Sequence, residues 1–120
     1  MKILIAEDEP LLLKTLELRL RKDGHEVITA SDGRQAIDQF LTCSPDMIIT
    51  DIMMPCASGL ELLIIIRKKN IKKIPVIVLS SMGQENVVME AFKLGADDYI
   101  TKPFSPNELS MRVRRFTASL

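Results

Sequence analysis

The sequence contains little of what many catalytic and metal-binding sites require. Its 120 residues include one histidine, His25, and two cysteines, Cys43 and Cys56, which have no Cys-x-x-Cys spacing. Histidine-based zinc sites and catalysis by Ser-His-Asp or Cys-His groups are therefore disfavoured. We expect His25 to be a solvated surface residue and both thiols to be free. Cys56 is interpreted as a passive loop thiol rather than a redox sensor.

Long apolar segments and an excess of charge of one sign are also missing. No apolar run approaches the ~20 residues that a membrane-spanning helix needs. Met1 and Lys2 lead directly into strand-like sequence without a signal peptide, so we expect a cytoplasmic protein with no membrane contact. Sixteen basic residues balance sixteen acidic ones, which argues against a nucleic-acid-binding surface built on bulk charge.

The length and composition indicate one compact domain. Apolar residues make up 47% of the chain and charged residues 27%. A chain of this size buries roughly two-thirds of its unfolded surface, so it needs neither a metal nor a disulfide to hold its core. We predict a single domain over residues 1–120, and any metal it binds should serve a function.

Short runs rich in isoleucine, valine and leucine recur along the chain at intervals of about 20–25 residues. Nearly continuous apolar runs are typical of strands that are covered on both faces, and such strands belong to parallel sheets. The predicted strands are Lys2–Ala6, Glu26–Ala30, Asp46–Thr50, Pro75–Leu79 and a weaker Asp98–Ile100.

Amphipathic segments with a 3.6-residue period lie between these strands. Ser58 begins one of them with a capping box that Glu61 completes. Gly95 is placed to end another as a left-handed residue, and Ser105 followed by Pro106 is a typical helix start. The predicted helices are Pro10–Lys22, Gly33–Leu41, Ser58–Lys69, Gln84–Leu94 and a last helix from Ser105.

This alternation predicts an α/β fold of (βα)5 order, doubly wound around a five-stranded parallel sheet. Right-handed crossovers place helices on both faces of such a sheet. Ligands of doubly wound folds bind outside the carboxyl ends of the strands, so functional residues are expected at that edge.

Polar residues follow four of the five predicted strands. They are Glu7 and Asp8 after the first, Asp51 after the third, Ser80 and Ser81 after the fourth, and Lys102 after the fifth. Carboxylates that converge raise one another's pKa unless a cation lies among them. A ligand set made only of oxygen atoms suits Mg²⁺, which shares its remaining positions with water and phosphate.

Each of these polar residues has an ordinary structural explanation when taken alone. Acidic and serine residues after a strand commonly cap a helix or form a turn, and a loop lysine is usually solvated. Their joint occurrence at four strand ends is improbable by chance. With Lys102 and a serine hydroxyl facing phosphoryl oxygens, the set indicates phosphoryl transfer.

Four segments of the chain resemble the receiver domain of two-component response regulators. They are ILIAEDE at 3–9, DIMMP at 51–55, SGLE at 58–61 and GADDYITKPF at 95–104. The resemblance covers the whole chain, and these motifs together are highly specific. It implies a flavodoxin-like sheet with strand order 2-1-3-4-5.

The resemblance also implies the chemistry of the site. Asp51 would be the phosphoacceptor, which takes a phosphoryl group from the phosphohistidine of a histidine kinase or phosphotransfer protein. Mg²⁺ would be bound by Asp8, Asp51 and the backbone carbonyl of Met53. Glu7 would act on the ion mainly through water. Such a domain is a signalling switch rather than an enzyme, although it catalyses its own phosphorylation and dephosphorylation.

The switch residues follow from the same resemblance. Lys102 would pair with the phosphate, and Ser80 would close on it as the switch hydroxyl. Tyr99 would be the switch aromatic, which turns inward when the hydroxyl moves. The family also has a cis peptide before the proline of its Lys-Pro pair, here Lys102–Pro103. The signal would reach the face formed by the fourth helix, fifth strand and fifth helix.

Two apolar residues beside the expected phosphate site differ from receivers that have polar residues there. Met53 lies two residues after Asp51, and Met82 lies two residues after Ser80. Neither side chain can orient an attacking water. We therefore expect slow autodephosphorylation.

Three other functions are compatible with parts of the pattern. A Mg²⁺-dependent phosphatase with an aspartyl nucleophile would need a second aspartate two residues on, where Met53 stands. A flavodoxin-like FMN carrier would need a hydroxyl-rich phosphate loop after the first strand, where Glu7, Asp8 and Glu9 would repel phosphate. A phosphorylation-independent interaction module would not need the acidic cluster.

The partners are less defined than the site. By resemblance to receivers of winged-helix transcription factors, ion pairs across a phosphorylation-dependent homodimer would involve Asp97, Asp98, Glu108 and Arg112. Val88 stands where a basic partner is usual. The basic end of the last helix is expected to be solvated rather than bound to nucleic acid. The output would be an effector protein or a domain that is not in this chain.

Overall fold

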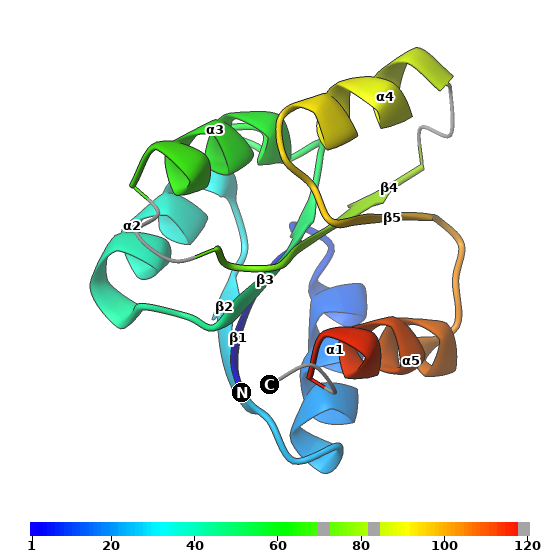
Figure 1. Ribbon diagram of the computed structural model, residues 1–120. Coiled ribbons are helices and arrows are strands. Elements are labelled where there is room, and N and C mark those ends of the chain that lie inside the picture. The colour runs from blue at the N-terminus through cyan, green and yellow to red at the C-terminus, as the bar shows by residue number, and fades with distance from the viewer. Residues whose placement is uncertain (70–72, 82–84, 118–120) are drawn as a thin grey trace.

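The computed structural model describes residues 1–69, 73–81 and 85–117, in which five strands and five helices alternate (Figure 1). The strands are β1 Lys2–Ala6, β2 Glu26–Ala30, β3 Met47–Asp51, β4 Val76–Ser80 and β5 Asp98–Thr101. The helices are α1 Pro10–Lys22, α2 Gly33–Cys43, α3 Gly59–Lys69, α4 Glu85–Lys93 and α5 Pro106–Thr117.

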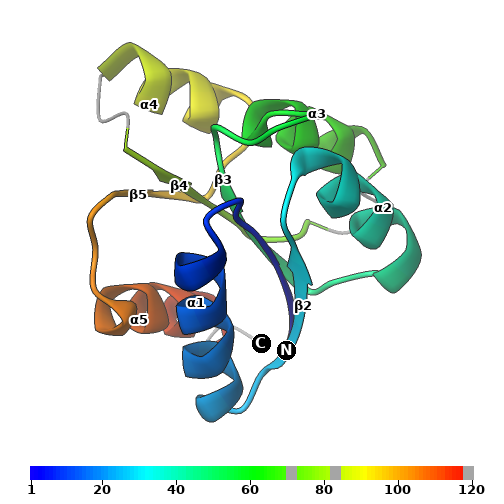
Figure 2. The same cartoon turned by 180° about the vertical axis from the view of Figure 1, so that it is seen from behind.

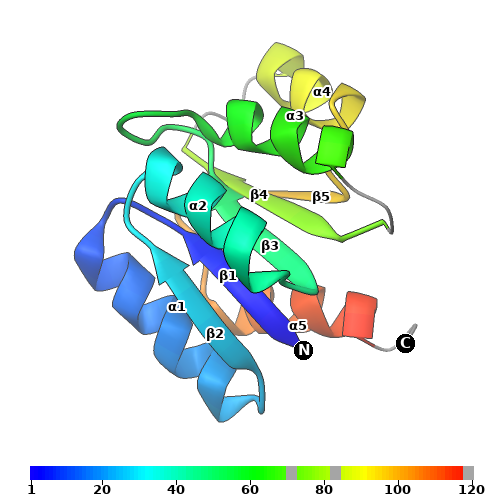
Figure 3. The same ribbon diagram turned by 90° about the vertical axis from the view of Figure 1, so that its left-hand side faces the viewer.

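The strands form one parallel sheet with the order β2-β1-β3-β4-β5. The predicted doubly wound α/β fold and the strand order implied by the family resemblance are both confirmed. Seen from the side, the sheet forms the middle layer between two layers of helices (Figure 3). The chain reverses its winding direction after β2, which leaves the ends of β1 and β3 side by side.

The two faces of the sheet are packed by different helices. Leu4 and Ile48 belong to an apolar cluster with residues of α2, α3 and α4. Ile3 and Ile49 belong to a second cluster with residues of α1 and α5. Figures 1 and 2 show the same division from opposite sides. Because successive side chains of a strand point to opposite faces, a strand covered on both faces must be apolar throughout.

The helix boundaries follow the caps expected from the sequence. Ser58 Oγ accepts a hydrogen bond from the Glu61 backbone N–H at 3.2 Å, and Ser105 Oγ accepts one from Glu108 N–H at 3.1 Å. Each serine therefore satisfies a donor in the first turn of its helix. Gly95 has a φ of +110° and follows α4, as a left-handed residue at a helix end does.

Two strands lie one residue further along the chain than predicted. β3 runs over Met47–Asp51 instead of Asp46–Thr50, and β4 over Val76–Ser80 instead of Pro75–Leu79. The parallel ladder continues to the pair Asp51 and Leu79, and on the next strand pair to Ser80 and Thr101. Asp51 and Ser80 are therefore the last residues of their strands, not loop residues.

Other boundaries differ slightly. α2 continues two residues beyond the predicted end at Leu41, to Cys43. The predicted start of the fourth helix at Gln84 lies outside the described residues.

His25 is half-buried rather than solvated, because the turn after α1 places its Nδ1 3.4 Å from the Met1 amino nitrogen. None of the helices in the described ranges has the length and apolarity that a membrane span requires.

Candidate functional site

Three acidic side chains converge at the carboxyl edge of the sheet. Glu7 follows β1 and is completely buried, Asp51 ends β3 and is 6% exposed, and Asp8 is exposed. One carboxylate oxygen from each lies within 4.8 Å of the others. The reversal of winding between β1 and β3 places these strand ends next to each other, so residues 44 positions apart meet. The predicted acidic cluster is thus assembled by the fold.

Lys102 reaches this cluster from the end of β5. Its Nζ lies 2.7 Å from Glu7 Oε1 and 3.0 Å from Asp51 Oδ2. The Lys102 backbone N–H donates to the Ser80 carbonyl oxygen at 2.8 Å, and the Lys102–Pro103 peptide is cis. The lysine therefore bridges two carboxylates that come from different strands.

Burial and charge act on these groups in opposite directions. Burial raises the pKa of Glu7 above its ordinary value. The hydrogen bond from Lys102 opposes this effect, and the nearby charge of Asp51 adds to it. Burial alone would lower the pKa of Lys102, but the hydrogen bonds to Glu7 and Asp51 raise it. Lys102 is thus held as a cation, and it offsets the repulsion between the two carboxylates.

The donor set of the cluster fits a hard divalent cation. All three acidic residues offer carboxylate oxygens within one small volume. Mg²⁺ prefers such ligands, keeps several waters, and binds through one or two carboxylates plus a phosphate. Asp8 is exposed, so one side of the cluster is open to water. Glu7, Asp8 and Asp51 could therefore hold Mg²⁺.

The loop of residues 52–58 joins β3 to α3 beside the cluster. Met53 lies in this loop, and it is 61% exposed. The Gly59 N–H donates to the Ile52 carbonyl at 2.8 Å, and the Gly33 N–H of α2 donates to the Pro55 carbonyl at 3.1 Å. Met53 lies two residues after Asp51, between Ile52 and Pro55. Its backbone is thus in a segment that these two hydrogen bonds hold on either side.

Ser80 and Tyr99 occupy the neighbouring strands β4 and β5. Ser80 is completely buried at the end of β4, and its register partner is Thr101 of β5. Tyr99 is 9% exposed and belongs to the same apolar cluster as Ala91 of α4. Ser80, the predicted switch hydroxyl, thus ends β4, and Tyr99, the predicted switch aromatic, lies on β5 and packs in the apolar cluster that includes Ala91 of α4.

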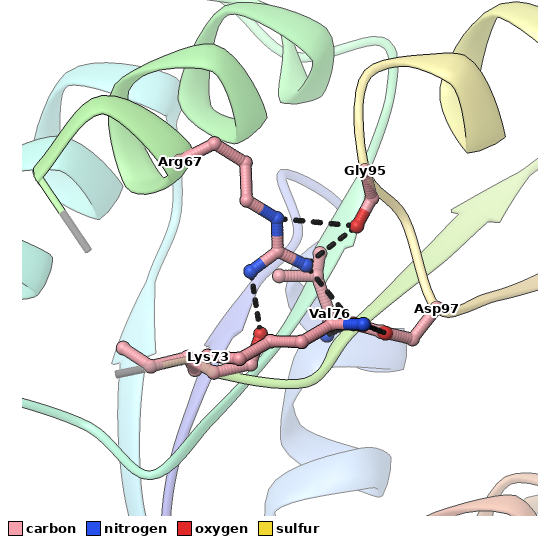
Figure 4. A network of polar contacts seen from close by, with 6 residues as sticks. Arg67, Lys73, Val76, Gly95 and Asp97 are labelled. Atoms are coloured by element: carbon pink, nitrogen blue, oxygen red, sulfur yellow. Dashed lines mark hydrogen bonds and ion pairs between the residues drawn. The ribbon is translucent and has the colours of Figure 1, made fainter. Parts of the chain in front are cut away.

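Asp97, one of the residues predicted at a dimer interface, is engaged within its own chain. Its Oδ2 accepts hydrogen bonds from Arg67 at 3.0 Å and from the Val76 backbone N–H at 2.8 Å (Figure 4). Lys73 Nζ lies 3.6 Å from Asp97 Oδ1. Asp97 precedes β5, so this network is at the edge of the sheet opposite the acidic cluster.

Arg67 is the centre of this network. Its guanidinium donates to the carbonyl oxygens of Gly95, after α4, and of Ile74, before β4. One side chain from the end of α3 therefore satisfies backbone groups of two loops. No local sequence pattern indicates this role for Arg67, because its partners Gly95 and Asp97 are 28 and 30 positions away in the sequence.

Asp98, another predicted interface residue, also has partners within the chain. Asp98 is 7% exposed, and its Oδ1 accepts a hydrogen bond from Arg112 of α5 at 2.7 Å. Arg115 lies 3.8 Å from its other oxygen. Glu108 is half-buried on the same helix. Of the four predicted interface residues, Asp97 therefore belongs to the Arg67 network. Glu108 and Arg112 lie on α5, and Asp98 of β5 contacts that helix through Arg112.

A family model described as the response regulator receiver domain matches residues 3–114 of the chain. Among curated proteins, a probable transcriptional regulator ycf27 of Guillardia theta is 44% identical over 94% of this chain and 44% of its own length. The alkaline phosphatase synthesis transcriptional regulatory protein PhoP of Bacillus subtilis is 39% identical over 94% of this chain and 47% of its own length. The chain spans about half the length of these relatives.

Solved structures agree with this similarity. The receiver domain of the Francisella response regulator 1452 has a TM-score of 0.88 and 39% identity, covering 94% of this chain and 93% of its own. The chemotaxis response regulator CheY4 of Vibrio cholerae has a TM-score of 0.89 and 30% identity, covering 95% of this chain and 96% of its own.

Proposed function

Because this chain belongs to the response regulator receiver family, we propose that it accepts a phosphoryl group on Asp51 from a histidine kinase or a phosphotransfer protein. The observation that supports this most directly is the position of Asp51, whose Oδ2 lies 3.0 Å from Lys102 Nζ within an acidic cluster. A carboxylate beside a fixed cation and two further acids is suited to phosphoryl transfer, in which charge neutralisation and positioning supply most of the catalysis.

In the proposed reaction, an oxygen of the Asp51 carboxylate attacks the phosphorus of a phosphohistidine. The P–O bond forms as the P–N bond breaks, and the imidazole leaves with the electron pair of that bond. Glu7, Asp8, Asp51 and the Met53 carbonyl are the groups that would hold Mg²⁺, with Glu7 acting mainly through water. The ion, when bound, would neutralise charge on the transferred phosphoryl oxygens.

Lys102 and Ser80 would respond to the new phosphoryl group. Lys102 pairs with two carboxylates in the structure. Once Asp51 is phosphorylated, the ammonium would pair with a phosphoryl oxygen, and the Ser80 hydroxyl would donate to another. Tyr99 would follow Ser80 and stabilise one arrangement of the face formed by α4, β5 and α5.

We propose that this face passes the signal to an output outside the chain. The two curated relatives described above are named as transcriptional regulators, and they are about twice as long as this chain. An output domain or a separate effector protein is the partner proposed for the switched face. Pairing of two copies through Asp97, Asp98, Glu108 and Arg112 is a further proposal, and the cytoplasmic location stays a prediction.

The test is modification by acetyl phosphate in the presence of Mg²⁺, followed by intact mass measurement. We expect one phosphoryl group on the wild-type chain and none on Asp51→Asn. Asp38→Asn is the matched control, because Asp38 is exposed on α2. A phosphoprotein that forms equally well in Asp51→Asn would overturn the assignment.

The same experiment separates the alternative functions. Turnover of many phosphate esters without a stable phosphoprotein would support a phosphatase with an aspartyl nucleophile. A folded chain that acetyl phosphate and beryllofluoride both leave unchanged would support a phosphorylation-independent interaction module. Slow loss of a single phosphoryl group supports the receiver.

A further inference from the structure

The loop of residues 52–58 is held between the first turns of two helices. The Gly33 N–H of α2 donates to the Pro55 carbonyl at 3.1 Å. The Gly59 N–H of α3 donates to the Ile52 carbonyl at 2.8 Å. The first N–H groups of a helix have no partner within it, so each helix offers donors that fix the loop.

Position 33 requires a glycine because the Ala57 backbone approaches it closely, and not because of the backbone conformation at Gly33. The glycines with positive φ in the described residues are Gly24 and Gly95, so Gly33 does not use the left-handed region. A Cβ added at Gly33 would overlap the carbonyl oxygen of Ala57 and lie 2.7 Å from the Ala57 Cβ. The overlap is with backbone, which no side-chain rotation can relieve.

This contact reaches the proposed metal site through the loop backbone. Met53, whose carbonyl is a proposed Mg²⁺ ligand, lies two residues before Pro55. The segment between Asp51 and Gly59 is short and held at both ends. A displacement of Ala57 is therefore expected to shift the neighbouring loop backbone as well. Gly33 itself is on a different helix, 18 residues before Asp51 in the sequence.

We propose that Gly33 is a positioning residue for Mg²⁺ binding: its missing side chain lets the 52–58 loop rest on α2, which sets where the Met53 carbonyl lies. The inference rests on the proposed function, because it concerns the metal which that function requires. Mg²⁺ demands near-ideal octahedral geometry, so its affinity is sensitive to small displacements of one ligand. Groups that orient metal ligands typically change affinity by roughly 10–100-fold when they are altered.

The test compares two glycine-to-alanine variants by calorimetric titration with MgCl₂. Gly33→Ala introduces a methyl group against the loop. Gly24→Ala is the matched control, because Gly24 has a φ of +98° and an added Cβ there meets nothing within 4 Å. The control strains the backbone in the turn after α1 but leaves the 52–58 loop unaltered. Thermal unfolding of both variants reports their stability separately.

We expect Gly33→Ala to raise the dissociation constant for Mg²⁺ roughly 10–100-fold. Gly24→Ala should lower the unfolding temperature and leave the dissociation constant within about twofold of wild type, because it alters no group near the site. Wild-type affinity in Gly33→Ala overturns the positioning role, as does an equal loss of affinity in Gly24→Ala. Absence of Mg²⁺ binding by the wild-type chain overturns the proposed function itself.

A second variant covers the case in which Gly33→Ala does not fold. Ala57→Val enlarges the same contact from the loop side, where the residue is half-buried and part of the added volume can reach solvent. It should weaken Mg²⁺ binding in the same direction as Gly33→Ala. A folded Ala57→Val variant with wild-type Mg²⁺ affinity also overturns the positioning role.

Discussion

The Lys102 ammonium lies 2.7 Å from Oε1 of Glu7, a carboxylate with no exposed surface. The other Glu7 oxygen accepts a hydrogen bond from the Glu9 backbone N–H at 3.2 Å. Glu7 is therefore buried with both oxygens engaged, and it depends on Lys102 for its positive partner. The same ammonium lies 3.0 Å from Asp51 Oδ2, so one residue offsets the charge of two carboxylates.

Replacing Lys102 with methionine should destabilise the Mg²⁺-free protein by about 3 kcal/mol, because it leaves a buried carboxylate without its partner. Urea unfolding at pH 7 measures the change. Addition of MgCl₂ should restore part of the lost stability, since a bound cation replaces the missing charge. Lys14→Met is the control, because the Lys14 pair with Glu17 is on the surface. Equal stability of Lys102→Met and wild type would contradict the prediction.

Replacing Arg67 with methionine should cost about 3 kcal/mol, because two carbonyl groups lose their Arg67 donor and the Asp97 carboxylate loses the closer of its two cationic partners. Lys73→Met is a matched control on the same carboxylate. The Lys73 side chain is 78% exposed and 3.6 Å from Asp97, so its loss should cost less than about 0.5 kcal/mol. Urea unfolding of both variants gives the comparison. Equal losses would show that Asp97 is held by charge alone rather than by the Arg67 network.

The contact between Ser110 of α5 and Asp23, after α1, should depend on pH. Ser110 Oγ donates to Asp23 Oδ2 at 2.6 Å. Burial acts to raise the pKa of Asp23, but hydrogen bonds from Ser110 and Arg19 together outweigh it and hold the pKa below its ordinary value. A lowered native pKa means that the contact stabilises the fold above the unfolded pKa of about 4 and is lost as the pH falls further.

Ser110→Ala should therefore lower the unfolding free energy by about 1 kcal/mol at pH 7, which is typical of a hydrogen bond. Its difference from wild type should shrink as the pH falls below about 4 and Asp23 becomes protonated in the native state. Denaturant unfolding across this range measures the difference. A constant difference at all pH values would mean that the Ser110 contact does not depend on the charge of Asp23.

The phosphorylated chain should lose its phosphoryl group slowly, because Met53 cannot orient an attacking water. Its side chain is 61% exposed beside the site, so a polar residue there is expected to speed hydrolysis roughly tenfold by positioning water. Phosphate release from purified phosphoprotein compares Met53→Asn with wild type. Met111→Asn is the control, since Met111 is 66% exposed on α5. A wild-type phosphoprotein lifetime of seconds or less would contradict the prediction. Met82, the other apolar residue expected to slow hydrolysis, lies outside the described residues.

Beryllofluoride with Mg²⁺ should shift the chain toward a dimer in size-exclusion chromatography, if the proposed interface forms. Arg112→Ala should weaken that shift, because Arg112 is one of the charges available to a partner copy. Within the chain it pairs with Asp98 at 2.7 Å, so dimerisation would have to share or replace this contact. Arg34→Ala, an exposed change on α2, is the control. An unchanged elution volume on activation would argue against the dimer.

Much of the fold followed from local pattern. The strands at Lys2–Ala6 and Glu26–Ala30 and the caps at Ser58 and Ser105 appear in the structure as predicted. Strand ends were less exact, because Asp51 and Ser80 are polar and resemble loop residues. They remain in the sheet because the neighbouring strands extend far enough to pair with them.

The sequence by itself determined the order of elements and the chemical types gathered at one edge of the sheet. Hydrophobic period and residue type are local properties, and the strand ends of a parallel sheet meet whatever their separation along the chain. The tertiary structure decided which groups touch. Lys102 meets Glu7 across 95 positions, Arg67 reaches Gly95 across 28, and Gly33 supports the loop at Ala57. These contacts depend on the packing of whole helices against the sheet, which no local pattern encodes.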